Sequence, residues 1–257
     1  MTDRSAKPMT VLAFMAHPDD AEFLCAGTLA RLHRQAGCKI VIATATSGDC
    51  GSIQHRPEQI ARIRHREAIA SATILKADYY CAGCMDLQIF YDRSTFMRFT
   101  EILRKARADV VLAPSPVDYM CDHENTSQIV RAATFAAPIP NVITEDGDPA
   151  EPLPAVPYLY YVDSVEGVDH FGKTVEPGFV VDITSVMPIK ERMLAAHASQ
   201  REWLRAHHGL DQYLLSMKAW SAARGRLIGV EYGEAFRQHL GHAYPKDNII
   251  LDLLGGK

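Results

Sequence analysis

Short apolar runs alternate with amphipathic, helix-length segments along the first part of this 257-residue chain. Residues 10–16 and 39–45 are runs of strand length, and residues 21–35 between them repeat leucines at helical spacing. A second helix over residues 57–75 and a third strand over residues 77–81 continue the order. Strands that alternate with helices at this spacing predict an α/β, Rossmann-like fold, in which a mostly parallel sheet carries helices on both faces.

The rest of the chain is expected to complete the same single domain over residues 1–257. Residues 138–157 contain six prolines, and a strand resumes directly after them, so we expect a surface excursion rather than a linker between domains. The further elements that we expect are a helix over 96–106, a strand over 109–113, a helix starting near Asp122, strands over 158–162 and 179–183, and helices over 187–206 and 211–227.

Composition and charge argue against several classes of partner. The net charge of −4 and the lack of a Lys/Arg run give no attraction for nucleic acid or for an anionic membrane surface. The apolar runs are far shorter than the roughly 20 residues that a membrane span requires. The N-terminus leads into a strand instead of a signal peptide, so we expect a cytoplasmic location and free thiols at the six cysteines.

One imidazole and three carboxylates are crowded into residues 16–22, Ala-His-Pro-Asp-Asp-Ala-Glu, where the first strand gives way to the first helix. Ionised carboxylates on one tight turn repel one another unless a divalent metal neutralises them or unless they spread into solvent and cap the helix. Asp19 or Asp20 could be such a cap, with Glu22 in the first turn. Taken alone, this segment leaves metal binding and helix capping equally open.

A second acidic cluster, Asp-Tyr-Met-Cys-Asp-His-Glu over residues 118–124, follows the strand over residues 109–113 and its Pro-Ser-Pro break. Because the carboxyl ends of parallel strands share one edge of a sheet, this cluster can lie beside the first. His17, Asp20 and His123 would then supply two nitrogens and one oxygen and leave a position open for water. That is the ligand set of a catalytic zinc ion.

The segment over residues 16–22 resembles, without alteration, the leading AHPDDxE motif of the PIG-L or LmbE-like zinc deacetylases. Further segments match this family in the same order and at similar separations: residues 46–51, 64–68, 122–123 and 196–200. The resemblance extends from about residue 10 to about residue 205. It implies a deacetylase that uses water to cleave an N-acyl amide.

The resemblance also implies roles for residues of both clusters. His17, Asp20 and His123 correspond to the zinc ligands of the family, and Asp19 corresponds to its general base. Zinc lowers the pKa of a bound water toward neutrality, and a carboxylate within hydrogen-bond reach can accept the proton. The metal could also be iron, cobalt or manganese, which a site of two histidines and one aspartate accepts.

Three further residues correspond to family positions around the metal, and each has an ordinary structural alternative. Asp122 would orient an imidazole or a loop amide, or it would simply cap a helix. Arg64 would contact the substrate, or it would pair with Glu67 on the helix surface. Asp86 would contact sugar hydroxyls, or it would be an acidic residue of a turn.

Met120 departs from the family pattern. Many members carry His-Pro-Asp-His where this chain has Met-Cys-Asp-His, so the histidine that helps to stabilise the developing oxyanion is replaced by a side chain that cannot donate a hydrogen bond. Either the metal alone polarises the carbonyl, or His197 or Tyr119 is the substitute donor, or activity is lost. His197 could equally be a packing residue.

The function that the resemblance implies is a zinc-dependent hydrolase that removes an N-acetyl or other N-acyl group from a small sugar-like molecule of the N-acetylglucosamine type. The alternative, motivated by Met120, is a catalytically impaired protein of the same fold that binds metal or sugar. The expected partner is therefore an N-acetylated small molecule. Family members are often oligomeric, so a homo-oligomer is also an expectation.

Overall fold

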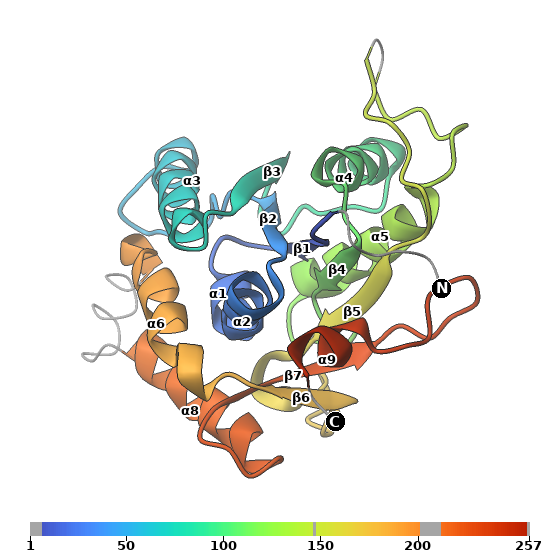
Figure 1. The fold of residues 1–257 in the computed structure, drawn as a ribbon. Coiled ribbons are helices and arrows are strands. Elements are labelled where there is room, and N and C mark those ends of the chain that lie inside the picture. The colour runs from blue at the N-terminus through green and yellow to red at the C-terminus, as the bar shows by residue number, and fades with distance from the viewer. Residues whose placement is uncertain (1–6, 146–147, 201–211, 256–257) are drawn as a thin grey trace.

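The computed structural model describes residues 7–145, 148–200 and 212–255. Its centre is a seven-stranded sheet of order β3-β2-β1-β4-β5-β7-β6 (Figure 1). The first five strands pair in parallel, and β7 runs antiparallel to both β5 and β6, so the prediction of a mostly parallel, Rossmann-like sheet is confirmed. The strands are β1 (Thr10–Met15), β2 (Lys39–Thr46), β3 (Asp78–Cys84), β4 (Val110–Ala113), β5 (Tyr158–Val162), β6 (Phe179–Asp182) and β7 (Gly233–Gln238).

Helices cover both faces of the sheet, as expected. Alternate residues of β1 point to opposite sides: Val11 and Met15 belong to the core beneath α2 and α6, and Leu12 and Phe14 to the core beneath α4 and α5. Figure 1 shows these two groups of helices on opposite sides of the sheet. The helices are α1 (Asp20–Leu24), α2 (Ala26–Ala36), α3 (Pro57–Ile74), α4 (Arg93–Ala106), α5 (Cys121–Ala136), α6 (Met187–Ala195), α8 (Gln212–Arg226) and α9 (Ile249–Leu254), with single 3-10 turns at Val165–Gly167 and Thr184–Val186.

Two predicted helices differ from the structure. The helix expected over residues 21–35 is divided into α1 and α2 at Cys25, whose φ of −145° is not helical. In place of the single helix expected over residues 187–206, α6 ends at Ala195, residues 196–197 are not helical, and residues 198–200 are helical again. Residues 201–206 of that prediction, like Asp211 of the next, lie outside the described residues.

Two elements near the C-terminus were not predicted. The strand β7 has the sequence Gly-Glu-Ala-Phe-Arg-Gln, which lacks a run of β-branched residues, and α9 has only six residues. The strand exists because β5 and β6 offer free edges on either side of it. Its pairing is therefore decided by tertiary contacts rather than by local propensity.

The segment over residues 138–157 joins α5 to β5 and has no helix or strand in its described part. It projects from the body of the molecule in Figure 1. Arg104 of α4 holds its base, because the buried guanidinium donates hydrogen bonds of 2.8–2.9 Å to the carbonyls of Ala137, Ile139 and Val142. Glu101 accepts hydrogen bonds from Thr144 and Ala150 further along.

The described helices include none that is both long enough and apolar enough to cross a bilayer. All six cysteines are free, including Cys81 and Cys84 on β3. For function, the important consequence of the fold is that the loops after β1, β2, β3 and β4 meet at one edge of the sheet, where parallel strands present their carboxyl ends.

Candidate active site

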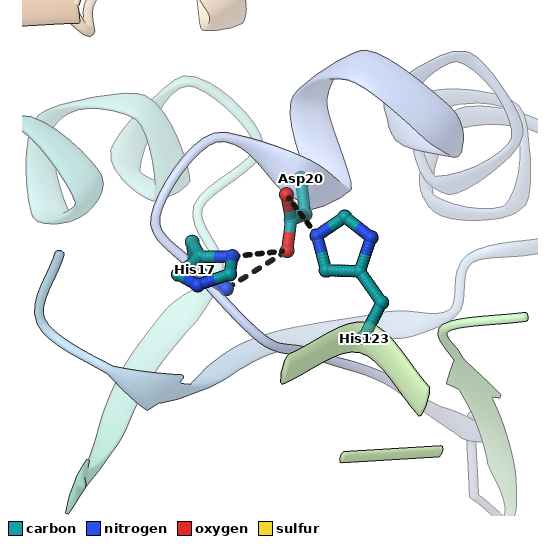
Figure 2. A group of neighbouring side chains, drawn as sticks. All are labelled: His17, Asp20 and His123. Carbon is teal, nitrogen blue, oxygen red and sulfur yellow. Dashed lines mark hydrogen bonds and ion pairs between the residues drawn. The ribbon is translucent and has the colours of Figure 1, made fainter. Parts of the chain in front are cut away.

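The fold brings His17, Asp20 and His123 together, although more than 100 residues separate the two histidines along the chain. Asp20 lies between the imidazoles: His17 Nδ1 is 3.5 Å from its Oδ2 and His123 Nε2 is 3.6 Å from its Oδ1 (Figure 2). His17 follows β1, Asp20 begins α1, and His123 lies in the first turn of α5. One ligand atom from each residue lies within 4.8 Å of the others, a spacing that suits a single metal ion.

Each imidazole is held by a buried carboxylate at the ring nitrogen that faces away from Asp20. Asp122 Oδ2 lies 3.1 Å from His17 Nε2, and Asp118 Oδ1 lies 2.9 Å from His123 Nδ1. Asp122 Oδ2 also accepts a hydrogen bond of 2.7 Å from the Leu87 amide, and it is not the N-cap of α5, which is Met120. Carboxylates that hold the second nitrogen of a histidine are typical of metal sites, because they fix both the tautomer and the ring orientation.

The electrostatics of this cluster favour a cation. Burial disfavours the charged imidazole of His17, but Asp122 and Asp20 outweigh that effect and raise its pKa to about 9. Burial is likewise outweighed at His123, where Asp20 and Asp118 raise the pKa to about 10. Burial would raise the pKa of Asp20, yet the two histidines hold it well below its usual range. The carboxylates thus favour positive charge at both imidazoles, and a divalent metal can supply that charge by displacing the protons.

Asp19 is presented to the cavity by an unusual backbone conformation. Its φ of 102° lies in the left-handed region, which is costly for a residue other than glycine and is found where function requires it. It is the N-cap residue of α1, but its side chain makes no capping hydrogen bond. Instead Oδ1 accepts from Arg64 Nη2 at 3.2 Å and Oδ2 accepts from the Tyr213 hydroxyl at 2.6 Å. Burial raises the pKa of Asp19 despite the nearby charge of Arg64.

Arg64 points into the site rather than along the helix surface. It is 4 % exposed and also donates to the carbonyl of Pro18 at 2.6 Å. The alternative of an ion pair with Glu67 is not observed, because Glu67 accepts two hydrogen bonds from Ser199 instead. Arg64 Nε is buried and has no hydrogen-bond partner in the described part of the chain, so one donor is left for another molecule.

Asp86 is a buried loop residue on the cavity wall, 6 % exposed. Its Oδ2 accepts a hydrogen bond of 2.9 Å from the Cys50 amide, and its own amide donates to Asp49 Oδ1 at 2.7 Å. Its other oxygen, Oδ1, is buried and unpartnered within the described ranges. A buried acceptor without a partner is costly, so a hydroxyl from a bound molecule would be stabilising there.

His197 and Tyr119, the two candidates to replace the histidine missing at Met120, differ in their position relative to the cavity. His197 is completely buried, is not part of the cavity wall, and lies with Nε2 3.2 Å from Glu22 Oε1. His197 is therefore not positioned to donate to a substrate, and its contact with Glu22 favours the packing alternative. Tyr119 lines the cavity, is 66 % exposed, and contacts the His123 ring edge-on at 5.8 Å between centroids. Met120 also lines the cavity.

Glu22, the last residue of the leading motif, joins elements behind the site instead of entering it. It is 2 % exposed, accepts a hydrogen bond of 2.6 Å from Ser71 of α3, and faces His197 beyond the end of α6. Burial would raise its pKa, but His197 and Ser71 lower it below its usual value. The carboxylate therefore stays charged inside the protein and holds α1 against α3.

These residues surround a cavity of about 420 Å³, which is within the range for a small-molecule site. The lining combines polar and apolar groups. The polar or charged lining residues are His17, Asp19, Asp20, Cys50, Arg64, Asp86, His123 and Gln200; the apolar or aromatic ones are Phe23, Leu24, Leu87, Tyr119, Met120, Val165 and Tyr213; and Gly51 completes the list.

Two residues of this site were not assigned from the sequence. Asp118 was recognised only as part of an acidic cluster, although its place five residues before His123 is a usable signal. Tyr213 has no such signal, because it is one of ten tyrosines and stands 194 positions from Asp19. Only the packing of α8 on β7, β6 and α6 brings it into the cavity, where it meets Phe23 and Asp19.

Comparison with known proteins gives a consistent result. The sequence model of the family described as PIG-L, GlcNAc-PI de-N-acetylase, matches residues 12–134. Diacetylchitobiose deacetylase from Thermococcus kodakarensis is 28% identical over 200 residues, which are 74% of this chain and 69% of the relative. The residues matched by the family model include His17, Asp20 and His123.

Solved structures share the fold over nearly the whole chain. N,N'-diacetylchitobiose deacetylase from Pyrococcus horikoshii, in complex with an inhibitor, has a TM-score of 0.74 and 25% identity, covering 93% of this chain and 88% of its own. The 4-carboxy-2-hydroxymuconate hydratase of Pseudomonas putida KT2440 has a TM-score of 0.73 and 20% identity, covering 93% of this chain and 100% of its own. The second likeness shows the fold alone, and its different activity illustrates that the fold does not decide the reaction.

Proposed function

On the premise that this chain belongs to the PIG-L family, we propose that it is a zinc-dependent hydrolase that removes an N-acetyl group from a small sugar-like substrate. The observation that carries the proposal is the cluster of His17, Asp20 and His123, which opens into the cavity directly beside the carboxylate of Asp19. The relatives that act on diacetylchitobiose support an N-acetylated sugar as the substrate class.

The residues present suit zinc. Two imidazoles and one carboxylate are a common protein ligand set of catalytic zinc, and the cavity leaves room for a water or a substrate oxygen at a further position. The carboxylates of Asp122 and Asp118 behind the two imidazoles support this choice, because metal-ligating histidines usually have such partners. His17, Asp20 and His123 would hold the ion.

The chemistry then divides between the metal and the protein. When bound, the zinc ion supplies a Lewis acid for the amide carbonyl and makes water a stronger nucleophile at neutral pH. Asp19 accepts a proton from the attacking water as the oxygen of that water bonds to the carbonyl carbon. The same carboxyl group then gives the proton to the nitrogen as the C–N bond breaks, so the products are a free amine and acetic acid, which loses its proton to solvent to become acetate at neutral pH.

Tyr119 is the donor that we propose in place of the histidine missing at Met120. Its side chain lines the cavity against His123, and although the residue is 66 % exposed, partial desolvation of its hydroxyl and the charge of Asp20 raise the pKa to about 12. The phenol therefore keeps its proton and can donate to the developing oxyanion.

Arg64 and Asp86 are the polar contacts that we propose for the sugar. The unpartnered Nε of Arg64 can donate to a hydroxyl, and the unpartnered Oδ1 of Asp86 can accept from one. Both side chains are fixed by other hydrogen bonds, so little conformational entropy is lost when a substrate binds.

A second candidate function rests on Met120 alone. If no side chain replaces the lost donor, the protein binds metal and sugar without efficient turnover. Removal of one oxyanion donor typically costs about 10²–10³ in rate, so this alternative predicts weak or undetectable activity with the same fold and the same ligand.

The test is release of acetate from zinc-loaded protein supplied with N-acetylglucosamine, N,N'-diacetylchitobiose and simple N-acetylated amines. Asp19→Asn is the control, because it keeps the shape of the side chain and removes the base. We expect release by the wild type and at least 10²-fold less by Asp19→Asn at equal zinc content. Absence of release from every substrate, with zinc bound, would favour the binding-protein alternative.

A further inference from the structure

Tyr213 contacts Asp19 from α8, and no other described residue of α8 lines the cavity. Its hydroxyl donates a hydrogen bond of 2.6 Å to Asp19 Oδ2, and its ring stacks on Phe23 at 5.9 Å between centroids with an interplanar angle of 30°. Phe23 belongs to α1, whose N-cap is Asp19, and both rings line the cavity. Tyr213 is therefore fixed at the ring by one contact and at the hydroxyl by another.

We propose that Tyr213 is the positioning residue of the catalytic base: its hydroxyl, together with Arg64, fixes the plane of the Asp19 carboxylate toward the water that attacks the substrate. This inference rests on the proposed function, since a base needs a reaction to serve. It assigns to α8 an indirect part in catalysis, through Asp19.

The geometry explains why two donors are needed. Arg64 reaches only Oδ1, at 3.2 Å, and a carboxylate held at one oxygen can still rotate about its Cβ–Cγ bond. The Tyr213 hydroxyl holds the second oxygen and so removes that rotation. A carboxylate offers about four lone-pair sites, so two remain free for water after both donors have bound.

Tyr213 is suited to donate rather than to accept. Burial and the charge of Asp19 hold the pKa of its hydroxyl well above the usual range, so the phenol keeps its proton. Asp19 in turn cannot relax away, because its backbone is held in the left-handed region with its carbonyl bonded to the amide of Phe23 at 2.9 Å.

The proposal is tested with Tyr213→Phe, which keeps the ring on Phe23 and removes only the hydroxyl. We expect kcat for acetate release to fall roughly 10- to 100-fold, because misplacement of a catalytic group by about 1 Å can cost about 10² in rate. KM, zinc content and melting temperature are expected to stay at the wild-type values. Tyr160→Phe is the matched control, since it removes a tyrosine hydroxyl that bonds to Asn248, away from the cavity.

Other outcomes would overturn the proposal in distinguishable ways. An unchanged kcat would show that the hydroxyl does not serve the base, and a raised KM at unchanged kcat would make Tyr213 a substrate contact. Loss of zinc, or of stability beyond that of Tyr160→Phe, would make its role structural. A wild-type protein with no turnover in the same assay would remove the proposed function and this role with it.

Discussion

Asp118 holds His123 Nδ1 at 2.9 Å, and this contact turns the opposite nitrogen, Nε2, toward Asp20. We expect Asp118→Asn to weaken zinc binding about 10- to 100-fold, because the charge behind the imidazole is lost while the size of the side chain is kept. Competition with a chromogenic chelator measures the affinity. Asp252→Asn, an exposed change on α9, is the control, and equal affinity in both variants would contradict the role of Asp118.

Tyr119 and Met120 can be tested together, because one is the proposed substitute for the donor missing at the other. Removal of the Tyr119 hydroxyl in Tyr119→Phe is expected to lower kcat about 10²-fold with little change in KM, as for other oxyanion donors. Met120→His introduces the histidine found in many family members and is expected to recover part of that loss in the Tyr119→Phe background. Steady-state kinetics of the two single variants and the double variant measure the loss and its recovery. An unchanged kcat in Tyr119→Phe would mean that no donor besides the metal is needed.

At the scale of elements, a buried ion pair joins three of them behind the site. Lys190 of α6 is 1 % exposed and lies 2.5 Å from Glu234 of β7, whose carboxylate also accepts from the amides of Gly27 and Thr28 at the start of α2. A charge buried in this way needs its partner, because either group alone would carry the full cost of leaving water.

Lys190→Met should therefore destabilise the protein by about 3–5 kcal/mol, since it leaves the carboxylate of Glu234 buried without its cation. The double variant Lys190→Met/Glu234→Gln should lose less, because the unpaired charge is removed as well. Urea unfolding measures both free energies. A double variant that is less stable than Lys190→Met would show that the hydrogen bonds of Glu234 to α2 matter more than its charge.

For the whole molecule, we expect the proposed metal binding to be coupled to folding. The ligands come from the end of β1 and from the first turns of α1 and α5, so they are together only in the folded chain. Zinc present at about 100 times its dissociation constant should stabilise the folded state by about 2.7 kcal/mol.

In a chain of this size that stabilisation should raise the melting temperature by about 5 °C or more, and a chelator should reverse it. Calorimetry with and without zinc measures the shift. His123→Ala should melt at one temperature under both conditions; a zinc-dependent shift that persists in this variant would place the stabilising ion elsewhere.

The sequence by itself determined the order of strands and helices in the first half of the chain and the grouping of His17, Asp20 and His123. Strand and helix periods can be read over short windows, and in a parallel sheet the residues that follow the strands must meet at one edge. The three side chains were predicted together for that reason, and the motif that contains Asp19 predicted a carboxylate beside them; its role as the base stays a prediction.

Only the tertiary structure decided the rest of the site. Arg64 is an arginine on a helix, and no local pattern distinguishes a surface ion pair from a buried bond to Asp19. His197 fits a family motif, yet it packs against Glu22 because α6 ends at Ala195. Tyr213 lies 194 residues from its partner. Contacts between distant segments depend on how whole elements pack, and a short stretch of sequence does not specify that packing.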